Sequence, residues 1–198
     1  MQVLVHGTDG PRFEQGESDV HEAHQAYMDG FSEAFLGRGP ILSADGERHL
    51  GSVHVVTVDG PEAAHAFAFD EPYARAGWYS NVTVLPLAPC VSGTMWDRPR
   101  PAPEQVSAFV SASWQVEDYE SSWVDRVRDL IEGDESAPWL FGGLLLGDED
   151  PYVLGLAAAV DLAPEDAERQ FRRLVGRLDV TSPHVMARRW QRGGRDSD

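Results

Sequence analysis

Residues 39–45 read Gly-Pro-Ile-Leu-Ser-Ala-Asp, and residues 142–148 read Gly-Gly-Leu-Leu-Leu-Gly-Asp. Each stretch contains an apolar run that starts after glycine and is followed by turn-forming residues. A second apolar run comes next, at 53–58 in the first case and at 153–160 in the second. Two apolar runs around a turn are typical of a β-hairpin. The sequence therefore predicts one hairpin in each half of the chain.

Both hairpins are followed by the same kind of helix start. Val58-Asp59 aligns with Val160-Asp161 at a nearly equal distance behind its hairpin, and Pro61 and Pro164 come shortly after. Proline is favoured in the first turn of a helix, so helices are predicted from Pro61 towards Gly77 and over 165–178. The shared register indicates an internal repeat. The alternative, that any two α+β halves look alike at this level of detail, stays open.

Further elements lie on either side of the two hairpins. Strand character is found at 2–8, 81–87, 106–114 and 184–190, and apolar residues recur at helical spacing over 18–36 and 119–131. Each half then has the order β-α-β-β-α-β, which is the ferredoxin-like arrangement. We predict an α+β fold with two tandem ferredoxin-like units, at 1–88 and 105–192. A proline-rich linker, 89–104, joins them, and a disordered tail, 193–198, follows.

The composition limits the partners that the protein can have. The chain has 198 residues, 42% of them hydrophobic, and its 33 acidic and 16 basic residues give a formal net charge of −17. A surface this acidic repels phosphate backbones and anionic lipids, so no nucleic acid and no membrane partner is expected. The N-terminus lacks the pattern of a secretory signal, which indicates a cytoplasmic protein. A single cysteine, Cys90, excludes an internal disulfide.

Four short motifs in the first half occur in a distinctive order. Taken together they resemble the YCII-related (YciI-like) family, in the dimeric α+β barrel superfamily, over residues 1–88. The second half keeps the order of elements but has no histidine on its first helix, so it resembles a degenerate copy of the unit. The motifs are His24-Gln25-Ala26-Tyr27, Gly39-Pro40, Gly51-Ser52 and Asp70-Glu71-Pro72-Tyr73, the last followed by Ala76-Gly77.

The resemblance implies a sheet that packs against a second sheet, beside a pocket in which a histidine and a carboxylate perform acid/base chemistry. His24 matches the histidine of the family. The carboxylate is either Asp70 or Glu71, because the family has Asp directly before the Pro-aromatic pair and this chain has Glu there. Adjacent residues at a helix end point about 100° apart, so the two are not interchangeable. A tandem chain is expected to form the paired barrel within itself, and a homodimer of such chains stays open.

The residue chemistry agrees with such a pocket. The imidazole of His24 titrates near neutral pH and can accept or donate a proton. Ser52 can donate a hydrogen bond to a substrate oxygen or can merely begin a strand, and Tyr73 can line the pocket or join the core. His21 and His24 are spaced for one helix face, but no His-Glu-x-x-His pattern accompanies them, so no metal site is predicted.

No cofactor is predicted either. The chain contains no Gly-x-Gly-x-x-Gly, no phosphate-binding loop and no Gly-x-Ser-x-Gly sequence, which argues against nucleotide-dependent and hydrolase chemistry. Proton transfer on a small organic molecule remains, as in a lyase or an isomerase. The alternatives are a non-catalytic ligand-binding or sensor protein that uses the same pocket, and a structural partner of a basic protein. The identity of the substrate does not follow from the sequence.

Overall fold

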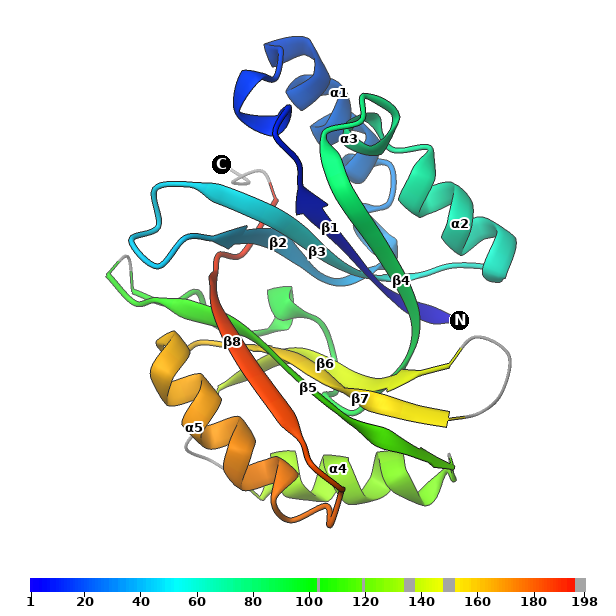
Figure 1. The fold of residues 1–198 in the computed structure, drawn as a ribbon, viewed down its shortest axis with the longest axis vertical. Helices are drawn as coiled ribbons and strands as arrows, with labels where there is room; N and C mark the ends of the chain where they lie inside the picture. Colours follow the sequence, from blue (N-terminus) through cyan, green and yellow to red (C-terminus); the bar gives the residue numbers. More distant parts are fainter. Residues whose placement is uncertain (103, 119, 134–137, 148–151, 195–198) are drawn as a thin grey trace.

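The computed structural model describes residues 1–102, 104–118, 120–133, 138–147 and 152–194 (Figure 1). Within these residues, eight antiparallel strands form a closed barrel. Helices cover the outer sides of its two halves (Figure 1). The strands are β1 Gln2–Asp9, β2 Phe35–Leu42, β3 His49–Thr57, β4 Tyr79–Pro89, β5 Ser107–Asp118, β6 Trp139–Leu146, β7 Tyr152–Val160 and β8 His184–Trp190. The helices are α1 Ser18–Asp29, α2 Pro61–Phe69, α3 Pro72–Arg75, α4 Ser122–Glu132 and α5 Pro164–Val175.

The strand order confirms the predicted fold class. Around the barrel it is β1-β3-β2-β8-β5-β7-β6-β4, and β4 pairs with β1 to close the circle. The first half contributes β4-β1-β3-β2 and the second β8-β5-β7-β6, which is the same ferredoxin-like order counted within each half. The halves meet at two seams. Ile41 pairs with Trp190 between β2 and β8, and residues 87–89 of β4 pair with residues 143–145 of β6.

The first predicted hairpin turn is confirmed. The backbone N–H of Gly46 donates to the carbonyl of Ser43 at 2.8 Å, and Gly46 has a φ of +84°, a conformation that glycine adopts without strain. The second predicted turn falls mostly on residues 148–151, which lie outside the described residues. The strands on either side of it, β6 and β7, pair along most of their length.

The predicted helix over 18–36 is too long. It ends at Asp29, followed by Gly30, and a short 3₁₀ turn, η2 Ser32–Ala34, leads into β2. Phe35, expected on the helix, is buried in β2 and pairs with Val56 of β3. The helical spacing of Phe31, Ala34 and Phe35 cannot be told from strand burial by periodicity alone, and pairing with β3 decides the conformation.

The segment predicted as a linker is packed against the barrel. β4 continues to Pro89, Cys90 and Met95 are buried, and a 3₁₀ turn, η3 Met95–Asp97, follows. Burial raises the pKa of the Cys90 thiol to about 11, so at neutral pH it stays protonated and unreactive. Residues 195–198 of the predicted tail lie outside the described residues. Gly193, where that tail was expected to begin, donates its N–H to the carbonyl of Arg38 at 2.8 Å.

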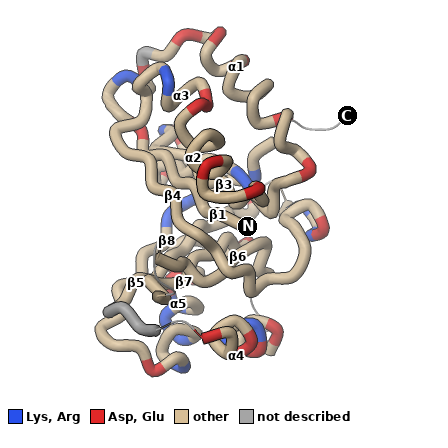
Figure 2. Tube along the Cα trace, turned by 90° about the vertical axis from the view of Figure 1, so that its right-hand side faces the viewer, with Lys and Arg blue, Asp and Glu red and all other residues tan. Residues whose placement is uncertain are grey.

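Three apolar clusters form the core, and the central one joins the two halves. It fills the barrel interior with side chains such as Leu4, Val55 and Ile41 from the first half and Leu140, Phe141 and Trp190 from the second. The other two clusters lie between each half's sheet and its own helices. Asp and Glu residues lie along the outer helices (Figure 2). Among the described residues, no helix is long and apolar enough to span a membrane.

Candidate functional site

His24 and Glu71 form a buried pair at the helical side of the first half. Nδ1 of His24, on α1, lies 2.9 Å from Oε2 of Glu71. Both residues are buried, with exposed fractions of 5% for His24 and 3% for Glu71. A carboxylate only accepts hydrogen bonds, so Nδ1 carries a proton, and in the neutral form of the ring the lone pair is then on Nε2. The pair therefore presents a histidine in the tautomer of a general base.

The short helix α3 fixes the position of Glu71. Glu71 is its N-cap residue, and its carboxylate accepts hydrogen bonds from the backbone N–H groups of Tyr73 at 3.0 Å and Ala74 at 3.1 Å. Pro72 occupies the first helical turn, where its missing N–H costs nothing. The Glu-Pro-Tyr sequence thus orients the carboxylate through the backbone itself.

Asp70, the alternative carboxylate, does not belong to this pair. Its Oδ1 accepts a hydrogen bond from Nη2 of Arg75 at 2.8 Å, and both side chains are more than half exposed. Asp70 ends α2 and Glu71 begins α3, so the chain direction changes between them and their side chains point to different places. The structure brings His24 together with Glu71 alone.

Tyr73 holds the ring of His24 in place. The two rings are stacked, with centroids 3.8 Å apart and planes 6° from parallel. The hydroxyl of Tyr73 lies 2.7 Å from Nδ1 of His21. Burial, assisted by the charge of Glu71, raises the pKa of Tyr73 above its ordinary value, so the phenol stays neutral. Burial lowers the pKa of His21, although that side chain is only partly covered.

A second histidine–carboxylate pair lies nearby, and the sequence did not reveal it. Nδ1 of His49 is 2.7 Å from Oδ2 of Asp9, and Nε2 of His49 is 3.4 Å from Oγ of Ser52. The His49 ring is also stacked on Phe13, with centroids 4.3 Å apart. Asp9 ends β1 while His49 and Ser52 lie on β3, and the pairing of these strands brings the three together. Their separation in the sequence explains why no local motif shows them.

The histidines of both pairs, His24 and His49, line one cavity of about 320 Å³. Its walls come from α1, β2, β3 and α3, and Gly193 and Gly194 add a wall from the segment after β8. The second half thus contributes to a cavity whose histidines all belong to the first. The lining side chains include the predicted residues His24, Ser52 and Tyr73, together with Phe13, His21, Gln25, Met28, Arg38, His49 and His54.

His54 lies fully buried at the back of this cavity. Burial lowers the pKa of His54 well below its ordinary value, and the nearby charges of His24 and Arg38 lower it further. Its ring centroid is 6.1 Å from that of His24. His54 is therefore neutral at physiological pH. Among the described residues, no group of three His, Cys, Asp or Glu side chains is arranged to hold a metal ion.

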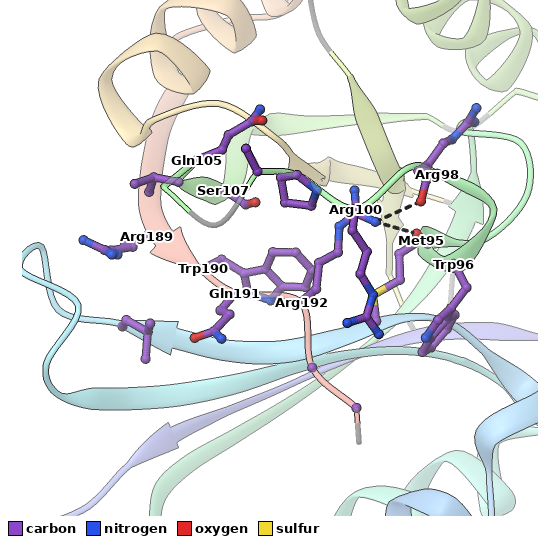
Figure 3. A pocket seen from close by; sticks show the side chains of 16 residues that line it. Met95, Trp96, Arg98, Arg100, Gln105, Ser107, Arg189, Trp190, Gln191 and Arg192 are labelled. Carbon is purple, nitrogen blue, oxygen red and sulfur yellow. Dashed lines mark hydrogen bonds between the residues drawn. The ribbon is translucent and has the colours of Figure 1, made fainter. Parts of the chain in front are cut away.

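Gly193 and Gly194 also line another cavity, of about 440 Å³ (Figure 3). Arg98, Arg189 and Arg192, which line this cavity, make hydrogen bonds within the chain. Arg192 donates to the carbonyls of Met95 and Arg98, both at 3.1 Å (Figure 3). It also pairs with Asp161 at 2.5 Å. Arg189 donates to the carbonyl of Asp45 at 3.2 Å. The contacts of Arg192 hold the segment after β8 against the chain that leads from β4 to β5, and that of Arg189 joins β8 to the turn between β2 and β3.

Comparison with known proteins shows what the first half is similar to. The sequence model of the YCII-related domain matches residues 1–88. No curated protein matches the chain. A solved dehydrochlorinase of 5-chloro-2-hydroxyhydroquinone from Burkholderia phenoliruptrix AC1100 is 25% identical over 44% of this chain and 94% of its own, with a TM-score of 0.41.

Two solved structures match almost the whole chain. A candidate monooxygenase from Lactobacillus acidophilus NCFM covers 96% of this chain and 92% of its own length, with 13% identity and a TM-score of 0.57. A mutant chlorite dismutase from Candidatus Nitrospira defluvii covers 96% and 91%, with 10% identity and a TM-score of 0.51. At such identity these two structures establish the fold and nothing further. The part of this chain that is similar to the YCII-related domain, residues 1–88, supplies β1 to β4, four of the eight strands of the barrel.

Proposed function

We propose that the YCII-related domain is the catalytic part of a cofactor-independent acid/base enzyme, of the lyase or isomerase type, that acts on a small organic molecule. The observation that carries this proposal is the buried contact of 2.9 Å between His24 and Glu71 at the edge of the cavity. His24 acts as the general base, Glu71 orients it, and Ser52 and Tyr73 contact the substrate. The acidic chain is expected to work in the cytoplasm.

The proton transfer can be written for the atoms present. Nε2 of His24 takes a proton from a carbon or hydroxyl of the substrate, and the resulting imidazolium is stabilised by the carboxylate of Glu71. The electron pair left behind moves into the substrate. The proton then returns to another substrate atom in an isomerisation, or leaves with a departing group in an elimination.

Hydrogen exchange tests this proposal without knowledge of the complete reaction. Small carbon acids, such as diketones and hydroxylactones, are incubated with the protein in D₂O, and loss of the C–H signal is followed by proton NMR. We expect exchange with the wild type, a loss of about 10²–10⁴-fold in His24→Gln, and no change in the control Asp70→Asn. Full exchange in His24→Gln contradicts the proposal. Ligand binding without exchange in any variant favours the ligand-binding alternative instead.

A chain of contacts from Ser52 to His49 and from His49 to Asp9 favours a second candidate reaction, acyl transfer. Ser52 Oγ faces His49 Nε2, and His49 Nδ1 faces Asp9, as in serine hydrolases. In this reaction Oγ attacks the carbonyl carbon of an ester while Nε2 takes its proton. Nε2 returns the proton to the departing alcohol, and water then releases the acid from Ser52. The contact of 3.4 Å is long, so this candidate ranks second.

Covalent labelling distinguishes the two candidates. A fluorophosphonate probe modifies a serine that is activated by a histidine, and mass spectrometry locates the label. Acyl transfer requires a label on Ser52 that disappears in His49→Gln and persists in His24→Gln. An unlabelled Ser52 in the wild type removes the second candidate and leaves the first untouched.

A further inference from the structure

One cationic side chain in the wall of the cavity takes no part in the proposed proton transfer. We infer that Arg38 is a binding residue for the carboxylate of an anionic small molecule, so that the substrate class is a small organic acid. The inference depends on the proposed function only in calling the bound acid a substrate. The binding of a carboxylate in this cavity stands on the observations that follow.

The guanidinium of Arg38 lacks partners for most of its donors. The residue is 7% exposed and lines the cavity. Nη2 donates to Oδ1 of Asp29 at 3.3 Å, while Nε and Nη1 are buried and have no hydrogen-bond partner within the described part of the chain. A guanidinium stays charged in proteins, so it cannot escape this cost by losing a proton. Buried charged donors without acceptors are unfavourable, and an anionic ligand would relieve them.

The surroundings hold the guanidinium in one place. Its central carbon lies 5.1 Å from the centroid of the Phe35 ring, in cation–π distance. The backbone carbonyl of Arg38 accepts the N–H of Gly193, and a Cβ added to Gly194 would be 3.7 Å from Nη2. A side chain at position 194 would therefore contact the guanidinium, and the glycine leaves this side of it uncovered. The second half of the barrel builds this part of the cavity.

The cavity itself selects for negative charge. Its described lining residues include one arginine and four histidines but no Asp or Glu. Three carboxylates lie nearby, and each contacts one of these cationic or basic groups. Glu71 and Asp9 accept hydrogen bonds from His24 and His49, and Asp29 accepts one from Nη2 of Arg38. In a chain with a formal net charge of −17, an anion needs such a local positive charge to enter.

The arginines of the larger cavity serve as a contrast. Arg192 donates to backbone carbonyls (Figure 3). Arg189 also donates to a backbone carbonyl, and Arg98 donates to the carbonyl of Ser92 at 2.9 Å. Acceptors within the chain thus take donors of all three side chains, although Nε of Arg192 is also buried without a partner in the described part of the chain. Arg38 differs because two of its donors lack partners and because it lines the same cavity as His24 and His49.

The position of Arg38 also suits the chemistry. Carboxylates make strong, oriented hydrogen bonds with guanidinium groups. A carboxylate on Arg38 would place the neighbouring carbon of the ligand in the space bordered by His24 and His49. Removal of a proton from that carbon spreads negative charge onto the carboxylate oxygens, where Arg38 stabilises it.

The test compares benzoate with benzamide, which has the same shape and no charge. Binding of each to the full chain is measured by ligand-observed NMR titration. We expect benzoate to bind at least about tenfold more tightly than benzamide, and Arg38→Met to remove that preference. The matched control Arg75→Met makes the same change in charge at an exposed position, and should keep it. Equal binding of both compounds to the wild type, or an unchanged preference in Arg38→Met, overturns the inference.

Further variants separate this result from folding and from the proposed function. Arg38→Lys keeps the charge and should bind benzoate with intermediate affinity. Arg38→Met removes a buried charge with unpaired donors, so its melting temperature should equal or exceed that of the wild type; a large fall would assign Arg38 a structural role instead. His24→Gln should still prefer benzoate. If His24→Gln still prefers benzoate and its hydrogen exchange is unchanged, the proposed role of His24 is refuted and that of Arg38 is not.

Discussion

At the scale of single residues, Glu71 and Asp70 are neighbours with different structural roles. Glu71 is buried and accepts two backbone N–H groups as well as His24, while Asp70 is exposed and pairs with Arg75. We predict that Glu71→Gln lowers the free energy of unfolding by about 1–3 kcal/mol, because a charged cap and acceptor is lost. Asp70→Asn should change it by less than about 0.5 kcal/mol. Urea unfolding of both variants measures this, and equal effects would contradict the assignment.

The buried histidine His54 predicts a pH dependence of stability. Burial lowers the pKa of His54 in the folded chain, whereas the unfolded chain binds the proton near the ordinary value of 6.5. The unfolded state therefore holds more protons below that pH. The stabilisation is complete above about pH 6.5 and falls as the pH drops, by up to about 1.4 kcal/mol for each pH unit. His6, whose pKa burial also lowers, acts in the same direction.

The measurement is urea unfolding of the wild type and His54→Gln between pH 7.5 and 5, with roughly equal steps in pH. Below about pH 6.5, the free energy of unfolding of His54→Gln should fall less steeply with pH than that of the wild type, by up to about 1.4 kcal/mol for each pH unit. The double variant with His6→Gln should flatten the curve further. An identical slope in all three proteins would show that His54 does not stay neutral in the folded state.

The residues of the candidate site could be predicted only where a local motif marks them. His24, Glu71, Ser52 and Tyr73 fall within the short motifs of the YCII-related domain. The choice between Asp70 and Glu71 could not be made, because it depends on how α2 ends and α3 begins. No local motif marks Arg38. Its buried donors without partners can be recognised only in the folded structure.

At the scale of elements, the sequence predicted their order and missed where some of them end. The strands of the hairpins and the proline-initiated starts of α2 and α5 have strong local signals, and they lie where they were expected. The helix predicted from Pro61 towards Gly77 is divided, because α2 ends at Phe69 and α3 begins at Pro72. The end of α1 and the extent of β4 were wrong. Strand pairing across the barrel decides both, as when Phe35 pairs with Val56 and Pro89 with Gly143. Such partners are distant in the sequence, so a local pattern does not contain them.

The close approach of β1 and β3 leads to a prediction about Gly51. A Cβ added there would lie 2.3 Å from the carbonyl oxygen of Gly7, so the two strands would have to move apart. Gly51→Ala should lower the free energy of unfolding by about 2–3 kcal/mol. It should also disturb the contact between Asp9 on β1 and His49 on β3.

Gly60 provides the matched control for that substitution. Nothing lies within 4 Å of a Cβ added at Gly60, and its φ of 167° is extended backbone that alanine adopts. Gly60→Ala should therefore change stability by less than about 1 kcal/mol. Urea unfolding compares the two variants, and the imidazole NMR signals of His49 report on the strand movement. Similar stability of the two variants would mean that β1 and β3 are not packed this closely.

At the scale of the whole molecule, the two halves differ in what they provide. The histidines, Glu71 and Arg38 belong to the first half, and the second closes the barrel and supplies Gly193 and Gly194 to the cavity wall. We keep the domain bounds 1–88 and 105–192 as a proposal. The seams are short, but the central apolar cluster draws side chains from both halves. A shared core of this kind favours unfolding of the chain as one unit.

Phe141 tests whether that shared core couples the halves. It is 1% exposed, and its ring lies against Gly37 of the first half, where an added Cβ would be 2.1 Å from Cδ1. Phe141→Ala should lower the free energy of unfolding by about 3–5 kcal/mol, whereas Phe69→Ala, at a position 41% exposed, should cost less than about 1 kcal/mol. Native-state amide exchange should show protection falling equally in β1 and β7 of Phe141→Ala. If only β5 to β8 lose protection, each half folds on its own core, and the first half can hold its histidine pairs in place without the second.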